Sequence, residues 1–95
     1  MYFALVAHDR PNAVARRMEI RPAHLEHLDA LGDDLILAGP FLDDRGDMVG
    51  SIVVIEAPGL DQAKAIFNRD PFVTGGLFDS ITIKPWKLGV NKTPR

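Results

Sequence analysis

Short apolar runs alternate along the chain with segments of helical periodicity. The apolar runs predict four strands, at residues 2–7, 34–38, 49–57 and 78–83. Helical spacing predicts a turn or two of helix at residues 12–20 and two main helices, at residues 22–31 and 60–69. An exposed hairpin loop is expected at residues 41–48, and a loop or short turn at residues 72–77. The order β-α-β-β-α-β predicts a ferredoxin-like α+β sandwich, in which a four-stranded antiparallel sheet carries two helices on one face.

Proline and glycine mark the expected ends of these elements. Pro22 is predicted to begin the first main helix, because its missing N–H costs nothing in the first turn. Gly32 would cap the end of that helix. Gly39–Pro40 is expected to end the second strand, and Asp70–Pro71 to stop the second helix, since a residue before proline disfavours the α conformation.

The first main helix presents a histidine beside its apolar face. Leu25, Leu28 and Leu31 recur at helical spacing and mark a buried face. His24 lies one turn before Leu28, so it shares or borders that face. An imidazole held against apolar surface can act as an acid or a base. The alternative is a core histidine with one hydrogen-bond partner.

Both faces of the predicted sheet are apolar. In the third strand, Val53 and Ile55 point to one side and Ile52 and Val54 to the other. Two helices cover only one face, and a half-solvated antiparallel sheet would alternate apolar with polar residues. The simplest cover for the second face is another copy of the chain, in a twofold homodimer. Aspartate at Val53 or Ile55, whichever faces the partner, should then dissociate or unfold the protein.

The composition narrows the function classes. The 95 residues make one domain, 46% hydrophobic and 25% charged, as in ordinary globular proteins. The net charge is −2 with both signs interspersed, so no nucleic-acid partner is expected. The chain contains no cysteine, which excludes a disulfide scaffold and a thiolate nucleophile and favours a reducing, cytoplasmic location. No signal peptide and no membrane span are expected.

Asp70 is the leading candidate partner of His24. The start of the first helix and the end of the second can approach each other if the helices pack side by side. A carboxylate beside an imidazole fixes its tautomer and supports its cationic form. Alternatively, Asp70 initiates a turn through its own side chain.

Other polar positions carry weaker hypotheses. His24 and His27 have a spacing that suits two metal ligands on a helix, but no third ligand is evident, so no metal is expected. Asp9 follows the first strand, where residues often line sites, or forms a polar turn before a proline. Ser51 lies in an apolar strand and faces a pocket or bonds locally, without the G-x-S-x-G motif of a nucleophile. Phosphate-binding glycine motifs are absent. Three aromatic residues are expected in the core: Phe72, Phe78 and Trp86.

Several short motifs, in order along nearly the whole chain, resemble the YciI-like (YCII-related) domain family. They are Arg21-Pro22-Ala23-His24-Leu25, Leu37-Ala38-Gly39-Pro40, Gly50-Ser51, Asp70-Pro71-Phe72, Gly75 and Lys84-Pro85-Trp86-Lys87. The resemblance implies one YCII-like domain over residues 1–88, followed by a polar tail over residues 89–95. It also implies the dimeric α+β barrel fold, built from ferredoxin-like subunits.

The same resemblance implies a site centred on a histidine and an aspartate. The histidine corresponds to His24 and the aspartate to Asp70, with Asp9 competing for the second role. Substrate-binding roles are assigned to Asp9, Ser51, Gly39, Pro40 and Arg21. One branch of the family looks like a dehydrochlorinase of chlorinated hydroxyhydroquinones. The resemblance suggests a cofactor-independent enzyme acting on a small organic molecule, which in that branch is aromatic. The loop at residues 41–48 is shorter than in some relatives.

Two hypotheses from different classes follow. The first is an acid–base enzyme without cofactor or metal, with His24 as base or acid. The second is a non-catalytic domain that binds a small ligand or acts as a scaffold. A cavity at His24 would favour chemistry or binding, whereas a fully packed His24 would favour a structural role.

Overall fold

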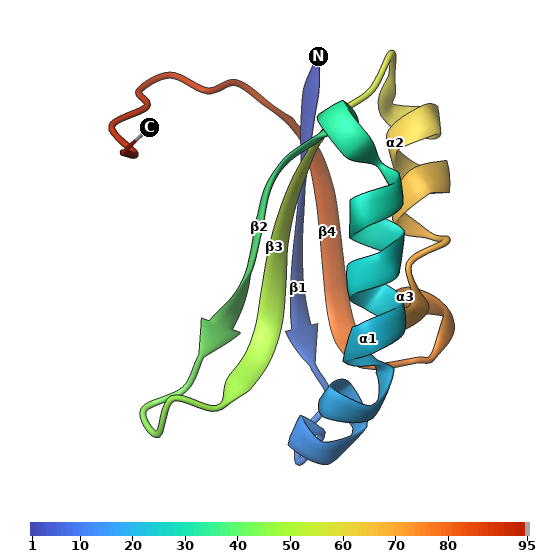
Figure 1. The fold of residues 1–95 in the computed structure, drawn as a ribbon, viewed down its shortest axis with the longest axis vertical. Coiled ribbons are helices and arrows are strands. Elements are labelled where there is room, and N and C mark those ends of the chain that lie inside the picture. Colours follow the sequence, from blue (N-terminus) through green and yellow to red (C-terminus); the bar gives the residue numbers. More distant parts are fainter. Residues whose placement is uncertain (95) are drawn as a thin grey trace.

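The protein is a four-stranded antiparallel sheet with helices on one face, as a computed structural model shows for residues 1–94 (Figure 1). The strands are β1 (Tyr2–Asp9), β2 (Leu35–Leu42), β3 (Met48–Glu56) and β4 (Phe78–Trp86). The helices are α1 (Val14–Ala30), the 3-10 turn η1 (Gly32–Asp34), α2 (Leu60–Phe67) and α3 (Pro71–Thr74). The strand order is β2-β3-β1-β4, with every neighbouring pair antiparallel. The predicted ferredoxin-like fold is confirmed. Residues 89–94 of the predicted tail have no regular secondary structure, and Arg95 lies outside the described residues.

Helix α1 is one continuous helix, so the predicted break at Pro22 is wrong. Pro22 lies inside the helix, on its exposed side. The buried residues of α1 are Arg17, His24 and Leu28, which lie on both sides of the proline. Their burial against the sheet and α3 holds both halves in one helix, although proline removes one backbone hydrogen bond.

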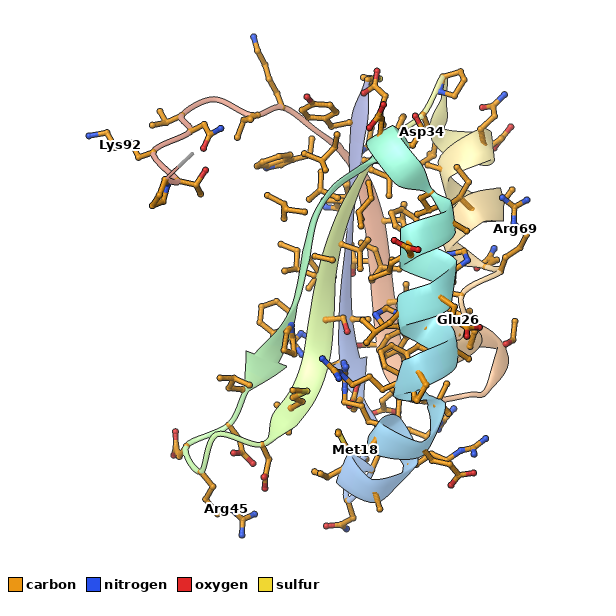
Figure 2. All side chains as sticks on the ribbon, in the orientation of Figure 1. Met18, Glu26, Asp34, Arg45, Arg69 and Lys92 are labelled. Atoms are coloured by element: carbon orange, nitrogen blue, oxygen red, sulfur yellow. The ribbon has the colours of Figure 1, made fainter. Side chains whose placement is uncertain are left out.

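Strand β2 also extends further than expected. Gly39–Pro40, predicted to end the strand, lies inside it, and Pro40 pairs with Ser51 of β3. Because β2 is an edge strand, one side of its backbone has no ladder partner, and proline is tolerated there. The predicted loop therefore shrinks to the turn at residues 43–47, which projects beyond the sheet with Arg45 at its tip (Figure 2).

The core lies between the sheet and the helices, where side chains fill the space between the two layers (Figure 2). The strands contribute Phe3, Leu5, Ala7, Val53, Ile55 and Phe78, and the helical segments contribute Leu28, Ala63, Phe67 and Phe72. Trp86 does not belong to it, because 38% of its surface is exposed near the end of edge strand β4. The prediction that it packs in the core is wrong.

The register decides which residues of the sheet face away from the helices. Val53 and Ile55 pair with Leu5 and Phe3 on the buried, helix-covered face. Neither can face a partner across the open side, so they were the wrong positions for an interface test. The open face of the sheet carries Tyr2, Ala4, Val6, Leu37, Phe41, Ile52, Val54 and Trp86, among others.

Candidate active site

His24 and Asp70 form a buried, hydrogen-bonded pair. Nδ1 of His24 lies 2.9 Å from Oδ1 and 2.8 Å from Oδ2 of Asp70. Both side chains are more than nine-tenths buried, at 9% and 8% exposure. The two residues are 46 positions apart in sequence and meet because α1 packs against α3. The structure therefore brings the two expected residues together; their chemical roles remain predictions.

Asp70 also caps a helix. It is the N-cap residue of α3, and its Oδ1 accepts a hydrogen bond of 2.9 Å from the backbone N–H of Phe72. The N-terminus of a helix stabilises negative charge. The turn-forming role of Asp70 and its contact with His24 are thus compatible, because one carboxylate oxygen accepts the backbone proton and the other remains for the imidazole.

Tight packing of α3 against α1 holds this pair in place. The His24 ring stacks on Phe72 with centroids 3.9 Å apart and planes inclined by 16°. Gly75 lies so close to α1 that a Cβ would come within 2.9 Å of Ile20 Cδ1 and 2.8 Å of the Pro71 carbonyl oxygen. A larger residue at Gly75 would push the two helices apart and move Asp70 away from the imidazole.

A pocket of ≈ 120 Å³ opens beside His24, between α1 and the β2–β3 side of the sheet. Apolar side chains and backbone make up most of its wall, and the polar side chains are few. It is lined by Arg17, Arg21, His24, Leu25, Leu28, Ala38, Gly39, Pro40, Met48, Ser51 and Val53. His24 is therefore not fully packed, which favours chemistry or binding over a purely structural role.

The second ring nitrogen of His24 is accessible, and His24 lines this pocket. Among residues 1–94, only Nδ1 has a hydrogen-bond partner, and no buried side-chain nitrogen or oxygen of that region lacks one. Nε2 must therefore be accessible. When Asp70 is ionised it accepts the proton of Nδ1–H, so Nε2 carries the lone pair. An accessible basic nitrogen on a residue that lines a pocket is what a general base needs.

Arg17 is a site residue that the sequence analysis missed. Its Nε donates to Oδ2 of Asp9 at 2.8 Å, and one terminal nitrogen donates to the Gly50 carbonyl at 2.5 Å and to Ser51 Oγ at 2.6 Å. The Arg17 and Asp9 side chains are each only 3% exposed. The guanidinium also lies 4.5 Å from the centroid of the Phe72 ring, a cation–π distance.

The predicted site residues divide into two groups. Arg21, Gly39, Pro40 and Ser51 line the pocket with His24. Asp9 does not line it and contacts Arg17 instead, so it is not the partner of His24 in this structure. Asp70 lies behind His24, outside the pocket wall.

Residues 1–94 contain no group of three or more histidine, cysteine or acidic residues arranged to hold a metal ion. His27, the second histidine of the suggested pair, does not line the pocket. We expect ligand binding in the pocket to be unchanged by EDTA, measured as the thermal shift produced by a bound ligand. If EDTA abolished ligand binding and one divalent metal restored it, this expectation would be contradicted, and His24 and His27 would be the candidate metal ligands.

His27 makes stability depend on pH. Partial burial lowers the pKa of His27 below 6.5; His24 and Arg69 lower it further, while Asp70 acts in the opposite direction. The folded state thus disfavours the protonated form, so this stabilisation is complete above pH 6.5 and is lost as the pH falls through the folded pKa. We expect His27→Gln to lose less free energy of unfolding than the wild type between pH 7.5 and pH 5, by urea titration. Equal losses in both proteins would contradict the prediction.

Comparisons with known proteins agree with the fold. The model of the YCII-related domain family matches residues 1–87. Protein YciI of Escherichia coli O6:H1 is 34% identical, over 92% of this chain and 97% of its own length. The uncharacterized protein YjpA of Bacillus subtilis is 42% identical over 68% of this chain and 73% of its own. No helix among residues 1–94 has the length and apolar character needed to cross a membrane.

A solved structure is similar over almost the whole fold. It is 5-chloro-2-hydroxyhydroquinone dehydrochlorinase (TftG) from Burkholderia phenoliruptrix AC1100, in complex with 2,5-dihydroxybenzoquinone. It is 33% identical with a TM-score of 0.84, covering 92% of this chain and 94% of its own. The cofactor-independent oxygenase SnoaB from Streptomyces nogalater, 10% identical with a TM-score of 0.56, shares the fold alone. By its match over residues 1–87 and its identity to YciI, this chain belongs to the YCII-related domain family.

Proposed function

We propose that the protein is a small enzyme that performs acid–base chemistry on a small organic molecule, without cofactor or metal. His24 is the general base or acid, and Asp70 orients it and stabilises its charged form. The observation that carries this proposal is the buried His24–Asp70 pair with Nε2 accessible at a pocket. An imidazole whose tautomer is set by a carboxylate is a recurrent arrangement for proton transfer.

The proposed substrate class rests on the volume of the pocket and on the similarity to TftG, a relative whose activity is known by name. A cavity of about 150 Å³ accepts a benzene ring, so a partly open pocket of ≈ 120 Å³ suits a substrate of one ring or less. TftG is named as a dehydrochlorinase of a chlorinated hydroxyhydroquinone. Loss of HCl from such a ring requires that one proton be removed as chloride leaves, and in this proposal His24 takes that proton. A cytoplasmic location, supported by the absence of cysteine, is part of the proposal.

The first test measures turnover of 5-chloro-2-hydroxyhydroquinone, with chloride release as the readout. A metabolite-library binding screen is run in parallel, and both experiments use the wild type and His24→Ala. Ligands that bind the wild type and are converted only when His24 is present support the enzyme. Ligands that bind both proteins and are converted by neither support the alternative, a non-catalytic binding domain.

We also propose that the protein forms a twofold homodimer through the open face of its sheet. All helices lie on the opposite side (Figure 1), and among residues 1–94 no element covers the apolar residues of this face. Of these residues Leu37 and Trp86 are exposed, at 41% and 38%, and Ile52 is half-buried. A contiguous exposed apolar patch is uncommon on a monomer. Two such faces packed together would bury more than about 1,200 Å² in total, the size of a stable interface.

The variant Ile52→Asp tests this dimer by placing a charge in the proposed interface. Ile52 lies in central strand β3 on the open face and is half-buried in the single chain, so a charge there is tolerated by the monomer and costs several kcal/mol in the dimer. We expect sedimentation at micromolar concentration to show a dimer for the wild type and a monomer for Ile52→Asp. Met18→Asp, at an exposed position of α1, is the control that should remain dimeric. A wild-type monomer would remove the proposal.

A further inference from the structure

The polar wall of the pocket beside His24 has one sign of charge. Two arginines, Arg17 and Arg21, and the histidine line it, and none of its lining residues is acidic. Asp70 is behind the imidazole and Asp9 is behind Arg17, so neither carboxylate faces the ligand space. A pocket of this kind attracts anions.

The two arginines differ in how far their charge is already satisfied. Arg17 is neutralised by Asp9 and further bound by a carbonyl and a hydroxyl. Arg21 is half-buried at the pocket, and among residues 1–94 it makes neither an ion pair nor a side-chain hydrogen bond. Since no buried side-chain nitrogen among residues 1–94 lacks a partner, the nitrogens of Arg21 are accessible and free to donate to a ligand oxygen.

A second unused donor faces the same space. Ser51 Oγ accepts the proton of Arg17 at 2.6 Å, which uses one lone pair. Its own O–H has no acceptor among residues 1–94, and the residue, although buried, lines the pocket. A hydroxyl that accepts a hydrogen bond from a cation becomes a stronger donor itself, because hydrogen bonds in a chain polarise one another.

We propose that the ligand of this pocket is a small oxyanion of one ring or less, a carboxylate or a phenolate, whose charge Arg21 binds while the Ser51 hydroxyl donates to it. The bound anion would then lie in the same pocket as Nε2 of His24. This inference deepens the proposed function and rests on it for the reacting group. Its own content, the preference for negative charge, is measured by binding alone.

The test compares ligands of the same shape with and without charge. Benzoate is paired with benzamide, and 4-nitrophenolate with 4-nitroaniline, with dissociation constants from NMR titration of the full chain at pH 8.5. Arg21→Gln removes the charge, and Arg21→Lys keeps it. Arg16→Gln is the matched control, because Arg16 is on the same helix but is exposed, paired with Glu19 and absent from the pocket wall.

We expect at least one oxyanion to bind about tenfold more tightly than its neutral partner, as a charge-assisted hydrogen bond provides. That ratio should fall to near one in Arg21→Gln, recover in part in Arg21→Lys, and remain in Arg16→Gln. The ligand pair with the larger ratio shows whether the preferred oxyanion is a carboxylate or a phenolate. A ratio near one in the wild type, a ratio unchanged in Arg21→Gln, or no binding of any probe at millimolar concentration would overturn the inference.

These outcomes are separate from those of the proposed function. If turnover depends on His24 but binding shows no preference for charged ligands, the inference is overturned and the proposed enzymatic function remains. A charge preference that depends on Arg21, in a protein whose His24→Ala variant keeps full turnover, would retain the inference and overturn the catalytic assignment.

Discussion

Replacing His24 by alanine is expected to lower turnover about 10²–10⁴-fold, the usual contribution of a general base or acid. The reason is that Nε2 of His24 is the accessible basic nitrogen at the pocket, with its tautomer set by Asp70. Turnover of an identified substrate is measured for both proteins, and circular dichroism reports whether each is folded.

Two further variants keep that test interpretable. His24→Ala leaves the buried Asp70 carboxylate with the Phe72 N–H as its remaining partner, so His24→Gln serves as a polar replacement if alanine prevents folding. His27→Gln is the matched control, since it removes a histidine one turn away on the same helix that does not line the pocket. If a folded His24 variant retained full turnover, His24 would not be the general base or acid.

Asp70→Asn tests the orienting role separately. Oδ1 of Asp70 accepts the Phe72 N–H, so the asparagine keeps its oxygen there and turns its NH₂ group towards Nδ1 of His24. A donor facing Nδ1 forces the ring proton onto Nε2 and removes the basic lone pair. We therefore expect a loss comparable to that of His24→Ala in a folded protein, because a wrong tautomer alone can cost about 10⁴-fold. Normal turnover would show that Asp70 is only a helix cap.

Removing Asp9 is expected to produce the largest loss of stability of the substitutions considered. Asp9→Ala leaves the Arg17 guanidinium, 3% exposed, without its carboxylate. Breaking a buried ion pair in this way costs about 3–5 kcal/mol. For a chain of this size that corresponds to a fall in Tm of roughly 12–40 °C. Thermal and urea unfolding measure the change.

A second variant and a control separate charge from packing. In Asp9→Ala combined with Arg17→Met, no charge is left buried, so much of the lost stability should return. Glu19→Ala breaks the exposed pair with Arg16 on the same helix and should change stability by less than about 1 kcal/mol. A loss of under about 1 kcal/mol for Asp9→Ala would mean that Arg17 does not depend on Asp9 for its burial.

The ferredoxin-like fold could be predicted because its signals are local. Alternating and continuous apolar runs mark strands within a few residues, and turn residues separate them. The four strands and both main helices occur where these signals predicted them, with shifted ends. The errors at Pro22 and at Gly39–Pro40 share a cause, since proline acts as a breaker only where its neighbours do not hold the backbone.

That error at Pro22 also hid the role of Arg17. Arg17 is seven residues before His24, and in one continuous helix these two positions lie on the same face. If the helix is predicted to break at Pro22, Arg17 and His24 belong to two separate helices. Nothing then places them on the same face, so Arg17 could not be connected with the site. The seven-residue spacing was the available signal, and it has meaning only if the helix is unbroken.

The sequence by itself determined the order of strands and helices, the apolar residues on both faces of β1 and β3, and the candidacy of His24 and Asp70. Only the tertiary structure decided that Asp70 contacts the imidazole while Asp9 binds Arg17. It also decided which side of β3 is left open. The physical reason is that both pairings join residues on different elements, and an ion pair forms where burial and packing bring two groups within hydrogen-bond distance, which no local pattern encodes.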